Sequence, residues 1–194
     1  LPAYGDEWSG VNFADGQEGL YNAEKAKTEF AKAKEALQGE GVQFPVHLDL
    51  PVDQSSKLSV AQAQSLKQTI EKSLGSENVV IDINQMSSDD MNNVTSNAAN
   101  AAAEDWDISN GVGWGPDYQD PSTYLDILKT TSSENTKAFN GYDDPNNAAA
   151  AQVGLKDYDA LLDSAASETT DINARYDRYA QAQAWLEDSS LIIP

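Results

Sequence analysis

One short segment of the sequence concentrates residue types that recognise ligands. Asp117 lies between Trp114 and Tyr118, and glycines at 111, 113 and 115 surround the tryptophan. A carboxylate accepts hydrogen bonds from cationic groups, aromatic rings offer flat apolar walls with polar tips, and glycines let another backbone approach closely. The combination is typical of a recognition site in which Asp117 accepts hydrogen bonds from a cationic group. The predicted binding residues are Val112, Gly113, Trp114, Gly115, Asp117 and Tyr118.

The elements on either side of this segment predict where it lies in the fold. Trp106 and Ile108 alternate with Asp107 as they would in a strand. Asp120 and Pro121 predict a helix start, in which Asp120 accepts the orphan N–H groups and Pro121 takes the first helical position. The segment is therefore expected to turn from a strand into a helix at the carboxyl end of the strand, where open α/β sheets bind ligands.

The sequence offers no comparable pattern for catalysis or metal binding. His47 is the only histidine and cysteine is absent, which excludes disulfides, thiolate catalysis and cysteine-ligated metals. Asp105 and Asp107 match the start of a calcium loop, but Gly111 comes one place late and Pro116 takes the position of the bidentate Glu. We therefore expect no catalytic residue, no metal and no cofactor.

The charge of the chain limits its partners. Its 194 residues include 32 acidic and 12 basic ones, which gives a formal net charge of -20. Nucleic acids and anionic membranes bind clusters of Lys and Arg, so we expect no nucleic-acid partner, and binding to an anionic membrane surface is disfavoured. The surplus carboxylates either attract a cationic ligand or form a solubilising surface. Neither a membrane-spanning run nor a signal-peptide pattern is present, so we expect a cytosolic protein or one whose targeting segment has been removed.

Hydrophobic periodicity predicts alternating helices and strands in the first part of the chain. Asn22 is expected to cap a helix that glycines at 39 and 41 end, and residues 44–50 alternate as a strand with one buried face.

The alternation continues through the next two elements. Ser59 and Gln62 have the spacing of a capping box for a helix that ends at Gly75. Residues 79–83 predict a second strand, and Ser88 is expected to cap a helix that extends to about residue 102.

The later part of the chain is predicted to be helical, over residues 121–129, 157–166 and 171–189. The last of these helices is expected to bury one stripe, made of Ile172, Tyr176, Tyr179, Gln183 and Leu186.

The order of the elements predicts an α/β fold with a mixed sheet flanked by helices and a helical C-terminal part. Residues 1–194 are expected to form a single lobe. Within it, residues 1–20 form an entering loop, residues 21–129 an α/β core, residues 130–147 a long loop and residues 148–194 the helical part.

Residues 113–125 closely resemble the W-x-x-D-Y-x-D-P-x-x-x-L segment of the extracellular peptide-binding proteins of ABC importers, the solute-binding protein family 5. Residues 21–27 are similar to a helix start of that family, residues 44–50 to its next strand and residues 175–188 to its late helix. The nearest branch is that of the oligopeptide-binding lipoproteins of streptococci and related Gram-positive bacteria. The resemblance covers nearly the whole chain.

This resemblance implies one lobe of a periplasmic-binding-protein-like (type II) fold, the carboxy-terminal one, without its N-terminal partner lobe. It implies capture of extracellular oligopeptides for import, by a lipoprotein anchored at the outer face of the cell membrane that serves ABC transporter permease subunits. In several relatives the aspartate of the motif pairs with the α-amino group of the peptide, and the resemblance gives this role to Asp117. Gly115 and Pro116 stand where other members have different residues.

Two other functions are compatible with the composition. An acidic, aromatic-rich cleft would suit a carbohydrate-active hydrolase that uses two carboxylates, although the sequence singles out no pair. The anionic surface would also suit a surface adhesin or interaction module. Activity on oligosaccharides would identify the first, and binding to a host protein instead of short peptides would identify the second.

Overall fold

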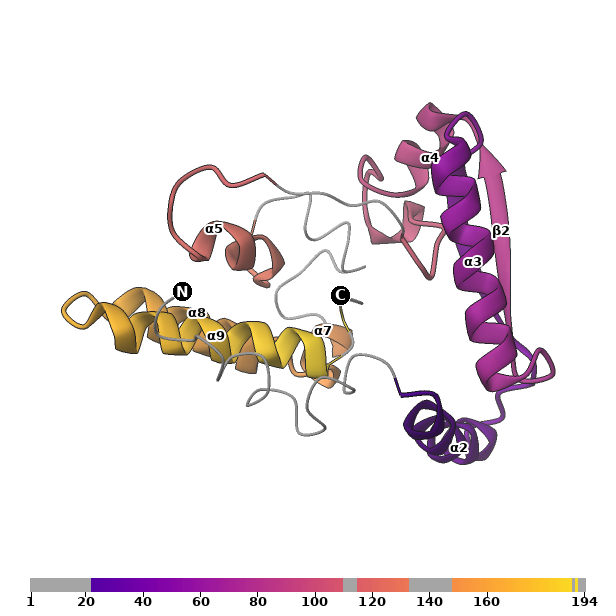
Figure 1. Cartoon of the computed structure of the whole chain (residues 1–194), viewed down its shortest axis with the longest axis horizontal. Coiled ribbons are helices and arrows are strands. Elements are labelled where there is room, and N and C mark those ends of the chain that lie inside the picture. The colour runs from indigo at the N-terminus through magenta and orange to yellow at the C-terminus, as the bar shows by residue number, and fades with distance from the viewer. Residues whose placement is uncertain (1–21, 110–114, 133–147, 190, 192–194) are drawn as a thin grey trace. The chain divides into compact units, whose positions relative to one another are not determined.

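The computed structural model describes residues 22–109, 115–132, 148–189 and 191 (Figure 1). These residues form two compact units, the first within residues 22–109 and the second from residue 115 onward. Whether the two units make up the single lobe expected from the sequence stays a prediction, as do the expected boundaries of its parts. Within the described ranges, every helix is too short or too polar to cross a membrane.

The first unit contains a parallel pair of strands joined by a helix. Strand β1 (Val46–Asp53) pairs with β2 (Val79–Met86) in parallel, with Val46 opposite Val79, and α3 (Lys57–Leu74) connects them. Figure 1 shows α3 lying along β2. Alternate strand residues and one alanine of α3 form the core, namely Leu50, Val52, Ala63, Val79 and Ile81. The alternation of strand and helix is therefore confirmed, but the sheet of the described residues is parallel and not mixed.

Side-chain caps set the starts of the helices in this unit. The Asn22 side chain accepts a hydrogen bond from the Lys25 N–H at 2.8 Å, which confirms it as the cap of α2 (Ala23–Gly39). The predicted cap Ser59 is wrong: Ser56 caps α3 and accepts the Ser59 N–H at 3.2 Å, so Ser59 already lies in the first turn. Several serines lie close together at this helix start, and the sequence pattern does not show which of them accepts the capping hydrogen bond.

The helix predicted from Ser88 begins there but ends early. Ser87 is its cap, and α4 (Ser88–Val94) stops well before residue 102. Thr95 donates its hydroxyl to the Met91 carbonyl at 2.7 Å, and short polar residues of this kind compete with helix hydrogen bonds. A short 3-10 turn, η2 (Ala101–Ala103), follows.

The strand predicted around residues 106–108 is a different kind of contact. The N–H groups of Asp107 and Ile108 both donate to the Asp49 carbonyl at 3.0 Å, and the Asp107 carboxylate accepts the Asp49 N–H at 2.8 Å. In a strand ladder, a backbone carbonyl would accept the Asp49 N–H in place of the Asp107 carboxylate. The segment therefore lies against β1 at Asp49 without continuing the sheet.

The second unit is helical. Its described elements are α5 (Ser122–Leu125), η3 (Asp126–Leu128), α7 (Ala148–Gln152), α8 (Leu155–Ser167) and α9 (Ile172–Asp188). Helices α8 and α9 lie side by side as a hairpin (Figure 1). Eight residues form the core of this unit, namely Leu125, Leu128, Tyr158, Leu162, Ala165, Tyr179, Ala182 and Leu186. The helix predicted over residues 121–129 is a short α-turn followed by a 3-10 turn.

The buried face of α9 differs from the predicted stripe. Tyr179 and Leu186 are buried as expected, but Ile172 is 56% exposed, Gln183 is exposed and Ala182 is fully buried. The prediction gave the buried face to the larger side chains. The small side chain of Ala182 lies on the face that α9 turns toward the core, whereas Ile172 and Gln183 do not.

Candidate functional site

The described part of the predicted binding segment forms an exposed turn before α5. We call residues 115–121 the recognition turn. Gly115, Asp117 and Tyr118 lie in it and are exposed, with Tyr118 at 51%. Val112, Gly113 and Trp114 lie outside the residues that the structure describes.

Two hydrogen bonds attach the exposed residues of the turn to α5. The Asp117 N–H donates to Thr123 Oγ1 at 3.0 Å, and the Tyr118 hydroxyl shares a hydrogen bond with Ser122 Oγ at 3.1 Å. Ser122 and Thr123 are both buried. A buried surface of α5 therefore holds the backbone of Asp117 and the ring of Tyr118, while both residues remain exposed.

Gly115 leaves space at the start of the recognition turn. A methyl group built on its Cα would meet no described atom within 4 Å. Among the described residues, packing therefore does not require a glycine at this position.

Asp120 combines the predicted helix cap with an ion pair. Its Oδ1 accepts the Ser122 N–H at 3.0 Å, so it bonds an N–H group at the helix start as predicted. Pro121, predicted as the first helical residue, instead occupies the N-cap position of α5. Nη2 of Arg175, from α9, also lies 3.1 and 3.0 Å from the two carboxylate oxygens. Burial favours a raised pKa, but the Ser122 hydrogen bonds and Arg175 outweigh it and hold the pKa of Asp120 below its ordinary value.

Arg175 is a functional candidate that the sequence did not suggest. Burial alone would lower its pKa, but the hydrogen bond to Asp120 raises the pKa of the guanidinium instead. Its guanidinium also lies 5.1 Å from the centroid of the Tyr179 ring. The arginine is 55 residues from its partner, so nothing in the local pattern marks the pair.

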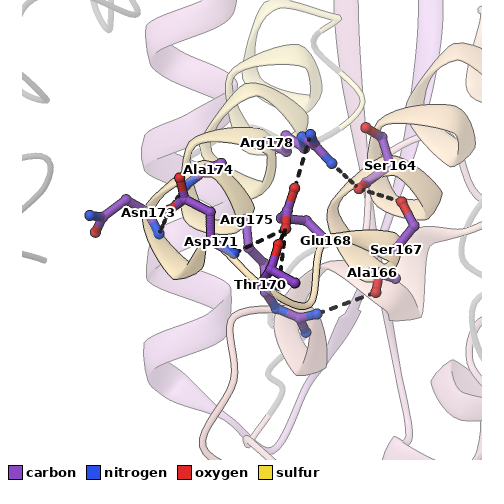
Figure 2. Close-up of polar contacts among 10 residues, drawn as sticks. All are labelled: Ser164, Ala166, Ser167, Glu168, Thr170, Asp171, Asn173, Ala174, Arg175 and Arg178. Carbon is purple, nitrogen blue, oxygen red and sulfur yellow. Dashed lines mark hydrogen bonds and ion pairs between the residues drawn. The ribbon is translucent and has the colours of Figure 1, made fainter.

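The loop between α8 and α9 fixes the helix that carries Arg175 (Figure 2). Glu168 Oε1 accepts the N–H groups of Thr170 and Asp171, both at 3.0 Å, and the Thr170 hydroxyl at 2.8 Å. These hydrogen bonds lower the pKa of Glu168 to about 2. Asp171 then caps α9 by accepting the N–H groups of Asn173 and Ala174.

The histidine and the aspartate considered above for catalysis or metal binding form contacts within the first unit. His47 is exposed on β1, with Nδ1 2.7 Å from Asp82 Oδ2. Asp107, considered above for a calcium loop, accepts the Asp49 N–H. Across the described ranges, no three acidic or histidine side chains are grouped so that they could hold a metal ion.

Curated relatives match the chain from end to end. It is 68% identical over 194 residues to the oligopeptide-binding protein AmiA of Streptococcus pneumoniae, and 65% identical to SarA of Streptococcus gordonii. The chain is homologous to a segment of the streptococcal oligopeptide-binding proteins. It spans 29% of the length of each of these two oligopeptide-binding proteins, so it corresponds to a part of them. No protein-family model matches the chain.

Solved structures of peptide-binding proteins share its fold. The chain aligns with a peptide-binding protein of a peptide ABC transporter at a TM-score of 0.63 and 23% identity, over 90% of this chain and 65% of that one. Listeria monocytogenes OppA bound to peptide aligns at a TM-score of 0.54 and 23% identity, over 86% of this chain and 26% of that one. The predicted resemblance to the family and the type II fold are confirmed; the assignment to one particular lobe stays a prediction.

Proposed function

We propose that the chain is part of the substrate-binding component of an ABC transporter that captures extracellular oligopeptides for import. The observation that carries this proposal is the 68% identity, along the whole chain, to a protein named for binding oligopeptides. The exposed carboxylate and aromatic ring on the recognition turn support it, since they suit the amine and a side chain of a peptide.

Asp117 is proposed to accept hydrogen bonds from the α-amino group of the peptide, beside the ring of Tyr118. Charge-assisted hydrogen bonds of this kind contribute about 1.5–3 kcal/mol, whereas a micromolar complex needs about 8 kcal/mol. Asp117 therefore supplies a minor share. The remaining binding free energy is expected from two sources. One is contact of the extended peptide with the backbone and the other predicted binding residues, namely Val112, Gly113, Trp114 and Gly115, and the other is a partner N-terminal lobe.

The finer parts of this proposal concern location and partners. We place the full-length protein at the extracellular face of the cell membrane, anchored as a lipoprotein and delivering peptides to permease subunits. The chain alone, which spans 29% of its relatives, is expected to bind peptides weakly.

The hydrolase alternative needs a general acid that is protonated near neutral pH. Asp120, the other acidic residue of the recognition turn, has a lowered pKa and is a poor proton donor. Burial raises the pKa of Asp126, which lies on η3 beyond the turn. No observation favours the adhesin alternative.

The test is calorimetric titration of the full-length protein that contains this chain with a pool of short peptides. Asp117→Asn should weaken binding roughly 10- to 150-fold, which corresponds to the free energy of the lost contact. The matched control is Asp177→Asn, an exposed aspartate of α9 that loses the same charge.

Acetylation of the peptide amine should weaken binding to the unmodified protein and abolish the difference between it and Asp117→Asn. Equal binding of free and acetylated peptides would rule out the role of Asp117. A full-length protein that ignores peptides altogether would rule out the function.

A further inference from the structure

We infer that Arg175 is a positioning residue for the recognition turn: its guanidinium links the end of α8 to Asp120 and thereby fixes the turn that carries Asp117 and Tyr118. The inference concerns peptide affinity only if the proposed function holds, whereas its effect on the turn can be measured in the chain itself.

The guanidinium contacts two elements at once. One nitrogen, Nη2, lies 3.1 Å from Asp120 Oδ1 and 3.0 Å from Oδ2. The other, Nη1, donates to the Ala166 carbonyl at 3.4 Å, in the last turn of α8. Figure 2 shows this second contact at the hairpin loop. A planar fork with two nitrogens can serve both partners, whereas the point charge of a lysine serves them poorly.

Asp120 passes this restraint to the exposed residues through α5. Its carboxylate accepts the Ser122 N–H, and its carbonyl accepts the Thr123 N–H at 3.2 Å. Ser122 Oγ contacts the Tyr118 hydroxyl, and Thr123 Oγ1 accepts the Asp117 N–H. Each exposed residue is therefore one hydrogen bond away from a residue that Asp120 holds.

Burial makes the arginine necessary in this arrangement. The side chains of Arg175 and Asp120 are 21% and 24% exposed. If the arginine is replaced by a neutral residue, the Asp120 carboxylate keeps the Ser122 hydrogen bond but loses its ion-pair partner in a partly buried place, which is unfavourable. The carboxylate is then expected to move toward water and to take the recognition turn with it.

Arg178 provides a matched control. It lies one turn later on α9, and it donates to the Ser164 carbonyl at 2.7 Å and approaches Glu168 at 3.4 Å. Both arginines therefore contact the end of α8 (Figure 2), but the contacts of Arg178 are within the hairpin, whereas Arg175 also reaches Asp120.

The first experiment compares ¹H–¹⁵N NMR spectra of the chain carrying Arg175→Gln or Arg178→Gln. The amide signals of Asp117, Tyr118 and Ser122 should shift in Arg175→Gln and stay in place in Arg178→Gln. Unchanged signals in Arg175→Gln, or equal shifts in both variants, would overturn the inference. If Arg175→Gln does not fold, Asp120→Asn removes the ion pair and retains an acceptor for the Ser122 N–H. The readout is then the amide signal of Asp117, which is bonded to Thr123 and not to Asp120.

The second experiment measures peptide affinity in the full-length protein. Arg175→Gln should weaken binding roughly 2- to 30-fold, the range of mutations that act through a network, and Arg178→Gln should leave it unchanged. Adding Arg175→Gln to Asp117→Asn should cause a smaller further loss than Arg175→Gln causes alone, because part of the effect of Arg175 acts through Asp117. A general loss of stability would instead add to the effect of Asp117→Asn.

The outcomes separate the two proposals. If Asp117→Asn binds peptides as well as the unmodified protein, the proposed role of the turn is wrong, and the amide shifts still decide whether Arg175 positions it. If Asp117→Asn weakens binding and Arg175→Gln does not, the role of Arg175 is wrong and the proposed function stands.

Discussion

The Tyr158 hydroxyl joins α8 to α5, since it donates a hydrogen bond to the Leu125 carbonyl at 2.7 Å inside the core. The tyrosine is fully buried, and burial raises the pKa of its phenol. We predict that Tyr158→Phe destabilises the chain by about 1–3 kcal/mol, because the Leu125 carbonyl is left buried without this donor.

Denaturant unfolding of the chain measures this effect, and Tyr124→Phe is the control. Tyr124 lies on α5 next to Leu125 but is 50% exposed, so the loss of its hydroxyl should change the free energy of unfolding by less than ~0.5 kcal/mol. Similar values for the two variants would contradict the prediction.

Glu168 gives the α8–α9 hairpin a dependence on pH. Its folded pKa of about 2 lies below the ordinary value of 4.5. The stability that its charged form contributes is therefore present above pH 4.5 and is lost as the pH falls toward about 2. We predict that Glu168→Gln lowers the Tm near neutral pH, and that the difference from the unmodified chain shrinks across this interval. Asp177→Asn should show no such convergence.

Single residues differ in how well the sequence predicted their roles. Asn22 and Asp120 were predicted as caps, because a cap acts on N–H groups within three residues. The Arg175–Asp120 pair was missed because it joins α9 to the turn before α5. Such a pair depends on how helices pack, which no local pattern contains.

At the scale of elements, α9 shows how a helical stripe can be misread. Its predicted and observed faces share Tyr179 and Leu186, and they differ at Gln183 and Ala182. We predict that Ala182→Leu destabilises the chain by about 1–3 kcal/mol through overpacking, since no space surrounds a fully buried alanine in a packed core.

The control for this prediction is Gln183→Leu, which adds a leucine on the exposed side. It should change the free energy of unfolding by less than ~0.5 kcal/mol. If the predicted stripe were correct, Gln183→Leu would stabilise the chain instead and Ala182→Leu would be neutral.

The strands show a second limit at the same scale. The alternation of apolar residues predicted β1 and β2 because one face of each strand packs against α3. The same alternation around residues 106–108 gave a strand that is not there. Ile108 does pack on this core. However, the Asp107 side chain, and not a backbone carbonyl, accepts the Asp49 N–H. The periodicity of apolar residues does not show whether a side chain or the backbone forms such a hydrogen bond.

At the scale of the whole molecule, the net charge of -20 acts on association. A strongly anionic protein attracts cationic ligands from a distance, and salt screens that attraction over about 8 Å at physiological ionic strength. If the proposed function holds, peptides rich in Lys should associate faster with the full-length protein than Glu-rich peptides of equal length.

Stopped-flow measurements between about 0.01 and 0.15 M salt test this expectation, since the advantage should fall steeply over that range. Association rates that are independent of salt and peptide charge would indicate that the carboxylates serve solubility alone.

The α/β class of fold and the resemblance to oligopeptide-binding proteins were predicted from the sequence, because both depend on features that repeat or extend along it. The order of strands and helices predicted the α/β class of fold. Residues 113–125, together with residues 21–27, 44–50 and 175–188, predicted the resemblance to oligopeptide-binding proteins. The division into two units within the described chain was not predicted, since a unit is defined by contacts between distant residues.

The outer edge of β1 has a consequence for solubility in concentrated solution. The N–H groups of Val46 and Gln54 donate toward the β2 side, whereas the backbone of Asp49 bonds residues 107 and 108 on the other side. Because backbone groups alternate between the two edges of a strand, those of His47, Asp49, Pro51 and Asp53 face away from β2. Proline has no N–H to offer, and both backbone groups of Asp49 are already bonded to residues 107 and 108. A strand from another molecule therefore finds the middle of this edge occupied, which protects the chain against edge-to-edge aggregation.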